Sequence, residues 1–179
     1  MPKARWIAAA SGAAVVVALA VSDAQAQRPR VSPHETHAFT IDGATITITY
    51  GRPSTRGRKI FGALVPYNVV WMPGADESTI FQTTAPLQFG DFKLPAGSYS
   101  LYTMPSEKQW QLIINKRTGQ FHTVYPSQDD LVTLPMTAET LPATVEQLTI
   151  AATPRPQGGG AIQLEWDMTR FSVPFTVSR

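Results

Sequence analysis

The chain has 179 residues and no cysteine, and its 15 Lys and Arg nearly balance its 13 Asp and Glu, giving a formal net charge of +2. The lack of cysteine excludes disulfides, thiolate chemistry, Cys-ligated zinc and lipid attachment through a leading cysteine. A general nucleic-acid-binding protein would be far more basic, so no nucleic-acid partner is expected. The composition predicts a protein held together by side-chain packing alone.

Residues 1–26 have the pattern of a secretory signal peptide. A positively charged start is followed by a short apolar run at residues 7–21, and small residues precede a cleavage site after Ala26. The run is at the low edge of what spans a bilayer, which favours cleavage over a stable membrane anchor. We therefore expect residues 27–179 to form one mature domain, with a net charge of about +1, that is periplasmic or secreted.

The first strong structural signal after this segment is a β-hairpin. The run ATITITY at residues 44–50 alternates Ile with Thr, which is typical of a half-buried strand. The run HAFTI at residues 37–41 precedes it, and Asp42-Gly43 joins the two. A two-residue Asp-Gly link favours a hairpin because both residues tolerate positive φ.

Strand-like runs continue along the chain, separated by Pro, Gly and Asp. They include STIFQTT (78–84), GSYSLYT (97–103), WQLIIN (110–115), LVTLPMT (131–137), VEQLTIAA (145–152), AIQLEW (161–166) and FSVPFTV (171–177). Nine or ten strands without a sustained helical period predict an all-β fold, an antiparallel β-sandwich that is jelly-roll-like or partly closed into a barrel. Pro135 and Pro174 are expected at edges or bulges because proline lacks an N–H.

The segment from Gly51 to Gly74 interrupts the strands. It is rich in Gly and Pro, and its stretch GRPSTRGRKIFG places four basic residues within eight positions. We expect a long loop with a short helical turn at residues 58–65. Irregular segments of this length in compact β domains are often functional.

The ordered series SPHET, TITYGRPSTRGRKIFGALVPYNVVW, GADEST and KLPAGSYSLYTMPSEKQWQLIINK resembles a bacterial secreted family catalogued as domain of unknown function 2911. The likeness runs from about Ser32 to Val177. It implies an exported, mainly β protein and no particular reaction. The family usually reads Trp-Arg-Thr-Gly-Ala-Asn-Glu where this chain has residues 71–77, with Met72 and Asp76 among the departures. If the family's Arg serves a ligand, this chain lacks that donor.

Residues 51–79 collect side chains that suit a small polar or anionic ligand, or a saccharide. Guanidinium groups match the oxygens of carboxylates, sulfates and phosphates, aromatic rings stack on flat ligands, and carboxylates accept from hydroxyls. The candidate ligand-binding residues are Arg52, Arg56, Arg58, Lys59, Tyr67, Trp71, Asp76 and Glu77. The alternative is structural: Arg52 and Arg56 pair with carboxylates of the protein and hold the loop, while Arg58 and Lys59 are solvated.

Metal binding and catalysis have weaker support. His34 and His37 do not match the H-E-x-x-H motif, and on a strand they point to opposite faces, so a site with His122 as third ligand is not expected. The motifs of serine hydrolases, P-loop proteins and dinucleotide-binding proteins are absent, and neither a cofactor nor a catalytic residue is indicated. The alternative functions are an envelope hydrolase using a carboxylate or a metal, and a cell-envelope scaffold or interaction protein.

Overall fold

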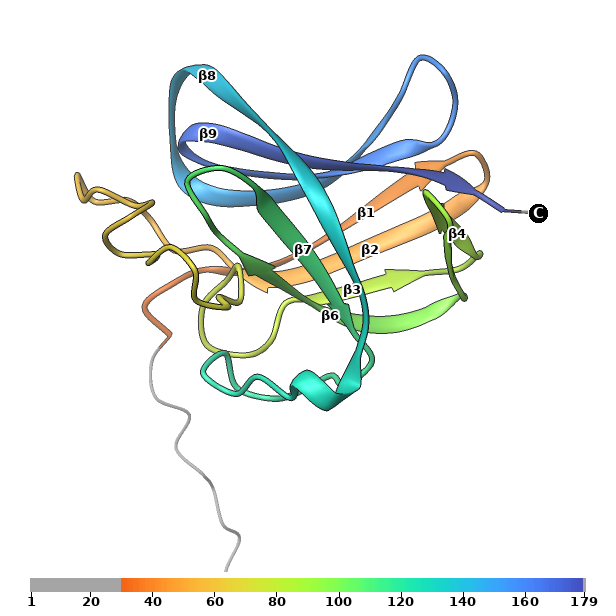
Figure 1. The fold of residues 1–179 in the computed structure, drawn as a ribbon, viewed down its shortest axis with the longest axis horizontal. Helices are drawn as coiled ribbons and strands as arrows, with labels where there is room; N and C mark the ends of the chain where they lie inside the picture. The colour runs from red at the N-terminus through yellow and green to blue at the C-terminus, as the bar shows by residue number, and fades with distance from the viewer. Residues whose placement is uncertain (1–29, 179) are drawn as a thin grey trace, which may run out of the picture.

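A computed structural model describes residues 30–178, which form one nine-stranded antiparallel sheet in the order β1-β2-β3-β6-β7-β8-β9-β4-β5 (Figure 1). The strands are β1 (His34–Ile41), β2 (Ala44–Gly51), β3 (Ile80–Thr83), β4 (Leu87–Phe89), β5 (Phe92–Leu94), β6 (Gly97–Met104), β7 (Trp110–Asn115), β8 (Asp130–Pro154) and β9 (Gly160–Val177). The predicted all-β antiparallel fold is confirmed. The predicted signal peptide lies outside the described residues.

The helical content of this part of the chain is a single 3-10 turn, Ser127–Asp129. No helix among residues 30–178 is both long and apolar enough to cross a membrane.

The β1–β2 hairpin forms as its sequence predicts. Ile41 pairs with Ala44 across the turn, and both central residues have positive φ, 48° at Asp42 and 84° at Gly43. This backbone matches the right-handed twist of the flanking strands. Ile46 and Ile48 are fully buried, so the alternation of the sequence fixes which face of the hairpin meets the core.

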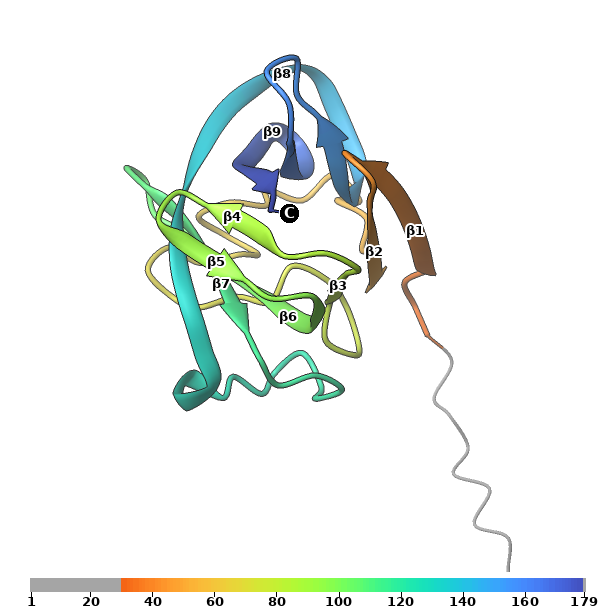
Figure 2. The ribbon, with the colours of Figure 1, turned by 90° about the vertical axis from the view of Figure 1, so that its right-hand side faces the viewer.

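The long strands β8 and β9 fold the sheet back over itself. Residues 130–136 of β8 pair with β7, whereas from Thr137 onward β8 pairs with β9, and the end of β9 pairs with β4. Figure 2 shows β8 arching around the molecule with β9 inside the arch. The two layers enclose a core whose largest fully buried side chains include Trp166, Tyr50 and Phe81.

The prolines of β8 and β9 lie where these two strands separate. Their mutual pairing stops at Thr137 and Ser172, and Pro135 and Pro174 lie just beyond it. No ladder bond between β8 and β9 is therefore lost at either proline. The separation leaves a groove on this side of the molecule, described below.

The loop between β2 and β3 runs without regular structure but is held firmly by backbone bonds. The amide of Thr55 donates to Glu146 O of β8 at 2.8 Å, and Trp71 and Thr103 of β6 exchange two bonds of 2.8 Å. Residues 58–65 do not form the expected helical turn. They make a compact set of turns in which the amides of Ala63 and Val65 both donate to Ile60 O.

Candidate functional site

Arg52 faces the interior and links three parts of the fold. Its Nη1 donates to Glu35 Oε2 at 2.8 Å, its Nε to Leu148 O at 3.0 Å and its Nη2 to Thr149 Oγ1 at 2.9 Å. Glu35 also accepts from His37 Nε2 at 2.8 Å. Arg52 thus joins β1 to β8 across the start of the loop, and its donors are used by the protein itself.

The contacts of Glu35 make the free energy of unfolding depend on pH in the acid range. Hydrogen bonding from His37, and then from Arg52, lowers the pKa of Glu35 below its ordinary value of 4.5. A carboxylate with a lowered folded-state pKa stabilises the fold above its unfolded pKa and loses that contribution as pH falls through the folded value. We therefore expect Glu35→Gln to be less stable than the parent near pH 7, with the difference shrinking below about pH 4.

Urea unfolding at about pH 7 and pH 3 measures this difference. Glu107→Gln is the matched control, because Glu107 is exposed and has no ion pair within residues 30–178. The prediction is contradicted if the difference in free energy of unfolding between Glu35→Gln and the parent is the same at both pH values.

Arg58 supports the loop from within. Its Nε donates to Thr55 O at 2.8 Å and its Nη2 to Ser54 O at 2.7 Å, so it ties down the backbone of its own turn. Part of the guanidinium remains available, because Nη1 makes no hydrogen bond with the described residues. Lys59 next to it is exposed.

Arg56 differs from its neighbours in both backbone and side chain. Its φ is 50° and that of Gly57 is 70°, and Arg58 N donates to Thr55 O at 3.0 Å. Positive φ at both central residues characterises a type I′ turn, in which Asn or Gly is usual at the first central position. A non-glycine residue in this region costs roughly 1–3 kcal/mol.

Glu146 of β8 holds Arg56 in this conformation. Glu146 Oε1 accepts from the amide of Arg56 at 2.9 Å, and its Oε2 accepts from the Thr55 hydroxyl. These two contacts lower the pKa of Glu146, the Thr55 hydroxyl having the larger effect. The guanidinium of Arg56 itself makes no hydrogen bond or ion pair with any residue from 30 to 178. The loop thus presents a guanidinium that has no hydrogen-bonded partner among residues 30–178 and interacts with the Glu146 carboxylate only through charge. We call it unengaged in this sense.

Arg56 and Arg58 line a hollow of about 420 Å³, here called the basic-loop hollow. Its other lining residues are Val31, Ser32, Pro53, Ser54, Leu64, Val65, Trp71, Gly74, His122 and Trp166. Among the described residues, no Asp or Glu lines it. The hollow therefore combines positive charge with apolar walls.

Two indole rings contribute to the apolar part of this hollow. Trp71 stacks on Trp166 with ring centroids 5.9 Å apart and planes 13° from parallel. Trp166 is only 1% exposed, and its Nε1 donates to Glu146 O at 3.3 Å. Trp71 is partly exposed, so it is the ring of the pair that a ligand can reach.

His122 adds a hydrogen-bond acceptor to the hollow. Its backbone amide donates to Asp76 O at 2.8 Å, and its ring Nδ1 lies 2.9 Å from the same oxygen. A carbonyl oxygen can only accept, so Nδ1 carries a proton and the neutral ring keeps its lone pair on Nε2. The sequence singled out His122 only as a metal candidate, and this role was missed because Asp76 is 46 positions away.

The two predicted carboxylates do not line the hollow. Glu77 binds Arg30 Nη2 at 2.5 Å and His34 Nε2 at 3.1 Å, and the hydrogen bond from Arg30 is the main reason that the pKa of Glu77 is lowered. Asp76 has φ of 66°, and its Oδ2 is buried without a partner among the described residues. Of the eight predicted ligand-binding residues, the hollow brings together Arg56, Arg58 and Trp71.

The three histidines have separate partners. His34 contacts Glu77 and the carbonyl of Ala75, His37 contacts Glu35, and His122 contacts Asp76 O. Within residues 30–178, no group of three or more His, Asp or Glu is placed to hold a metal ion.

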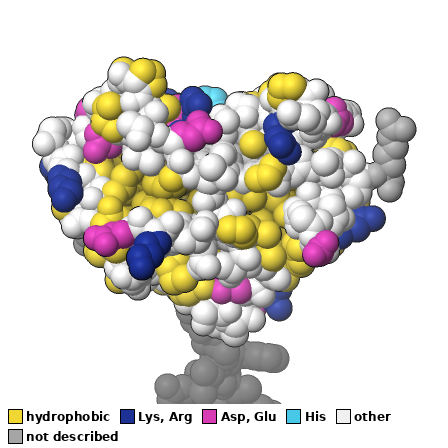
Figure 3. All heavy atoms as spheres, turned by 45° about the horizontal axis from the view of Figure 1, so that its top comes forward, with side chains coloured by type: hydrophobic (Ala, Val, Ile, Leu, Met, Phe, Trp, Pro, Cys, Tyr) yellow, Lys and Arg dark blue, Asp and Glu magenta, His cyan; other side chains and the backbone are white. Residues whose placement is uncertain are grey.

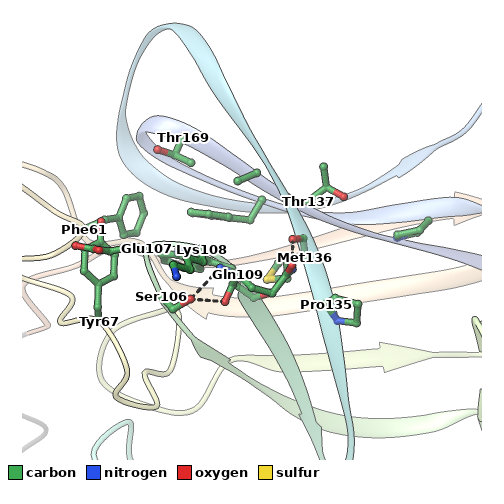
Figure 4. Close-up of a pocket in the computed structure, with 14 residues that line it drawn as sticks. Phe61, Tyr67, Ser106, Glu107, Lys108, Gln109, Pro135, Met136, Thr137 and Thr169 are labelled. Atoms are coloured by element: carbon green, nitrogen blue, oxygen red, sulfur yellow. Dashed lines mark hydrogen bonds between the residues drawn. The ribbon is translucent and has the colours of Figure 1, made fainter.

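A second concavity, here called the aromatic groove, lies where β8 and β9 separate (Figure 4). It has a volume of about 760 Å³ and runs between the turn Ser106–Gln109 and residues 135–138 of β8. Trp110 stacks on Phe171 at 3.6 Å, and Phe61 meets Trp110 edge-on at 4.8 Å. Figure 3, which brings β8 and β9 forward, shows hydrophobic side chains gathered in the hollowed parts of this face.

The predicted Tyr67 lines this groove and not the basic-loop hollow. The groove also contains one carboxylate and one ammonium, those of Glu107 and Lys108. It therefore offers no excess of positive charge to an anion.

These features define an antiparallel β-sandwich whose longest loop carries a small basic hollow. The chain belongs to the family described as "Protein of unknown function (DUF2911)", whose model matches residues 32–175. Comparisons with curated proteins and with solved structures gave no significant match.

The departure of this chain from the usual family sequence has a clear structural setting. Met72 is 3% exposed and packs with Tyr102 and Ile113 in a small second cluster. Its sulfur accepts from Thr79 N at 3.3 Å. Met72 does not itself line the basic-loop hollow.

Proposed function

We propose that this protein is an exported binding protein that holds a small anionic ligand in the basic-loop hollow. The observation that carries the proposal is the unengaged guanidinium of Arg56, held in a left-handed turn beside a hollow that no described Asp or Glu lines. Backbone strain at a residue with no internal side-chain partner is typical of functional positions. The pattern of residues 1–26 supports export.

The chemistry of the hollow suits an anion. The planar guanidinium of Arg56 donates in pairs to a carboxylate, sulfate or phosphate, and Arg58 adds charge close by. Hydrogen bonds of this charge-assisted kind contribute about 1.5–3 kcal/mol each.

The alternative functions receive less support from the same residues. A hydrolase that uses two carboxylates needs them on either side of a cleft, and no described Asp or Glu lines this hollow. The structural interpretation of the basic stretch applies to Arg52, whose donors are taken up by Glu35, Leu148 and Thr149.

Thermal unfolding of the purified protein with added anions tests the proposal. We expect sodium salts of sulfate, phosphate or small carboxylates to raise the melting temperature. A ligand present at 100 times its dissociation constant raises the free energy of unfolding by about 2.7 kcal/mol. Arg56→Gln should abolish the shift, while Arg155→Gln should retain it, because Arg155 is an exposed arginine in the turn between β8 and β9. No shift with any anion, or equal shifts in parent and Arg56→Gln, contradicts the proposal.

A further inference from the structure

The apolar surface of the basic-loop hollow is larger than an inorganic anion needs. Pro53, Leu64 and Val65 line it together with the two indoles. Apolar surface favours a ligand in proportion to the area that the ligand removes from water. A bare sulfate or phosphate would contact the guanidinium groups and leave the apolar side chains of the hollow exposed to water.

Exposed hydrophobic side chains surround the same hollow. Val31 is 74% exposed and Leu64 is 44% exposed, and both line it. Phe121 is 51% exposed and lies against His122, with ring centroids 4.4 Å apart. Two of the large exposed hydrophobic residues of the described chain thus line one small concavity, where the body of a ligand can cover them, and a third contacts a residue of its lining.

The charged groups of the hollow are donors, and its side-chain acceptors among the described residues are neutral. Arg56 and Arg58 only donate. The hydroxyls of Ser32 and Ser54, which also line the hollow, can donate or accept, and Nε2 of His122 accepts in the tautomer fixed by Asp76 O. The hydroxyls of a sugar need acceptors as well as donors, and a donor buried without a partner is unfavourable. Glu77, which would accept from hydroxyls, is engaged with Arg30 and His34. Much of the remaining lining is apolar, so an anion with an apolar body fits the hollow better than a sugar, whose many hydroxyls would face side chains that form no hydrogen bonds.

We infer that the ligand of this hollow is an organic anion with a planar or aliphatic body, such as an aryl or alkyl carboxylate. This inference rests on the proposed function and narrows its ligand class. The carboxylate binds the guanidinium of Arg56, and the body lies against Trp71 and Leu64. A hydroxyl or amide N–H on the ligand, where there is one, donates to Nε2 of His122.

The volume of the hollow agrees with a ligand of this size. About 420 Å³ accommodates one or two rings or a short chain and lies within the usual range of small-molecule sites. A polymer of several sugar units would extend well beyond it.

The test is a set of NMR titrations of the ¹⁵N-labelled mature protein, residues 27–179, following the indole N–H signals of Trp71, Trp110 and Trp166. The probes are benzoate and hexanoate, with acetate, sulfate, phosphate and glucuronate as anions that lack an apolar body, and benzyl alcohol as the neutral counterpart of benzoate. We expect benzoate or hexanoate to bind at least tenfold more tightly than each of the other probes.

Two variants check that binding occurs in this hollow. Arg56→Gln should remove benzoate binding. Leu64 is exposed, so the fold should tolerate a polar side chain there. Leu64→Asn should raise the dissociation constant of benzoate at least threefold and leave that of sulfate unchanged. Arg155→Gln should bind benzoate as the parent does.

The outcomes separate the two proposals. Sulfate, phosphate or glucuronate binding as tightly as benzoate, with loss in Arg56→Gln, overturns the ligand class and leaves the proposed function standing. Binding of benzyl alcohol as tight as that of benzoate, or no binding of any anion, overturns both.

Discussion

Replacing Arg52 with Met should lower the free energy of unfolding by about 3 kcal/mol. The substitution removes three hydrogen bonds at once, to Glu35, Leu148 and Thr149, and leaves the Glu35 carboxylate without its cationic partner. Because these contacts join β1 to β8 across the layers, the loss should appear in global unfolding and not only in the loop.

Urea denaturation followed by circular dichroism measures the effect of Arg52→Met. Lys59→Met is the matched control, since Lys59 belongs to the same loop but is exposed, and it should change stability by no more than about 0.5 kcal/mol. Equal stabilities of the two variants would show that Arg52 does not hold the layers together.

Replacing Arg56 with Asn should make the protein more stable and less able to bind its ligand. Asn adopts positive φ more readily than Arg, and Asn-Gly is a preferred central pair of a type I′ turn. Relief of the strain at φ of 50° should raise the free energy of unfolding by about 1 kcal/mol. The bond from the residue-56 amide to Glu146 remains available in the variant.

Arg56→Gln separates the two effects, because it removes the charge but keeps a side chain that disfavours positive φ. Both variants should lose anion binding in the thermal assay, and Arg56→Asn should exceed Arg56→Gln in stability. If Arg56→Asn proves less stable than the parent, the left-handed turn owes its conformation to a contact of the Arg56 side chain, and the proposal of an unengaged guanidinium fails.

The sequence predicted those parts of the fold that depend on neighbouring residues. Asp42-Gly43 sets a two-residue turn by its own backbone preferences, and the alternation of residues 44–50 determines which side chains meet the core. The continuity of β8 and β9 was not predicted, because Pro135 and the stretch between residues 137 and 145 look like strand ends locally. In the structure, β8 continues through these points while changing its partner from β7 to β9.

The sequence predicted the region of the candidate site, but not which of its arginines bind other parts of the protein and which line the hollow. Whether an arginine turns inward depends on partners far along the chain: Leu148 is 96 positions from Arg52, and Glu146 is 90 from Arg56. No local pattern reveals such pairings. The Arg-Gly pair between Thr55 and Arg58 was the one local signal that could have suggested a type I′ turn.

The stacked pair of Trp71 and Trp166 gives the hollow a built-in optical probe. Two indoles held 5.9 Å apart and nearly parallel are close enough for their electronic transitions to couple, which shapes the circular dichroism of the native protein. Because Trp71 is partly exposed and Trp166 is almost fully buried, a bound ligand would alter the environment of Trp71 more than that of Trp166. Occupancy of the hollow can therefore be followed spectroscopically on the unlabelled protein, without knowing in advance which anion occupies it.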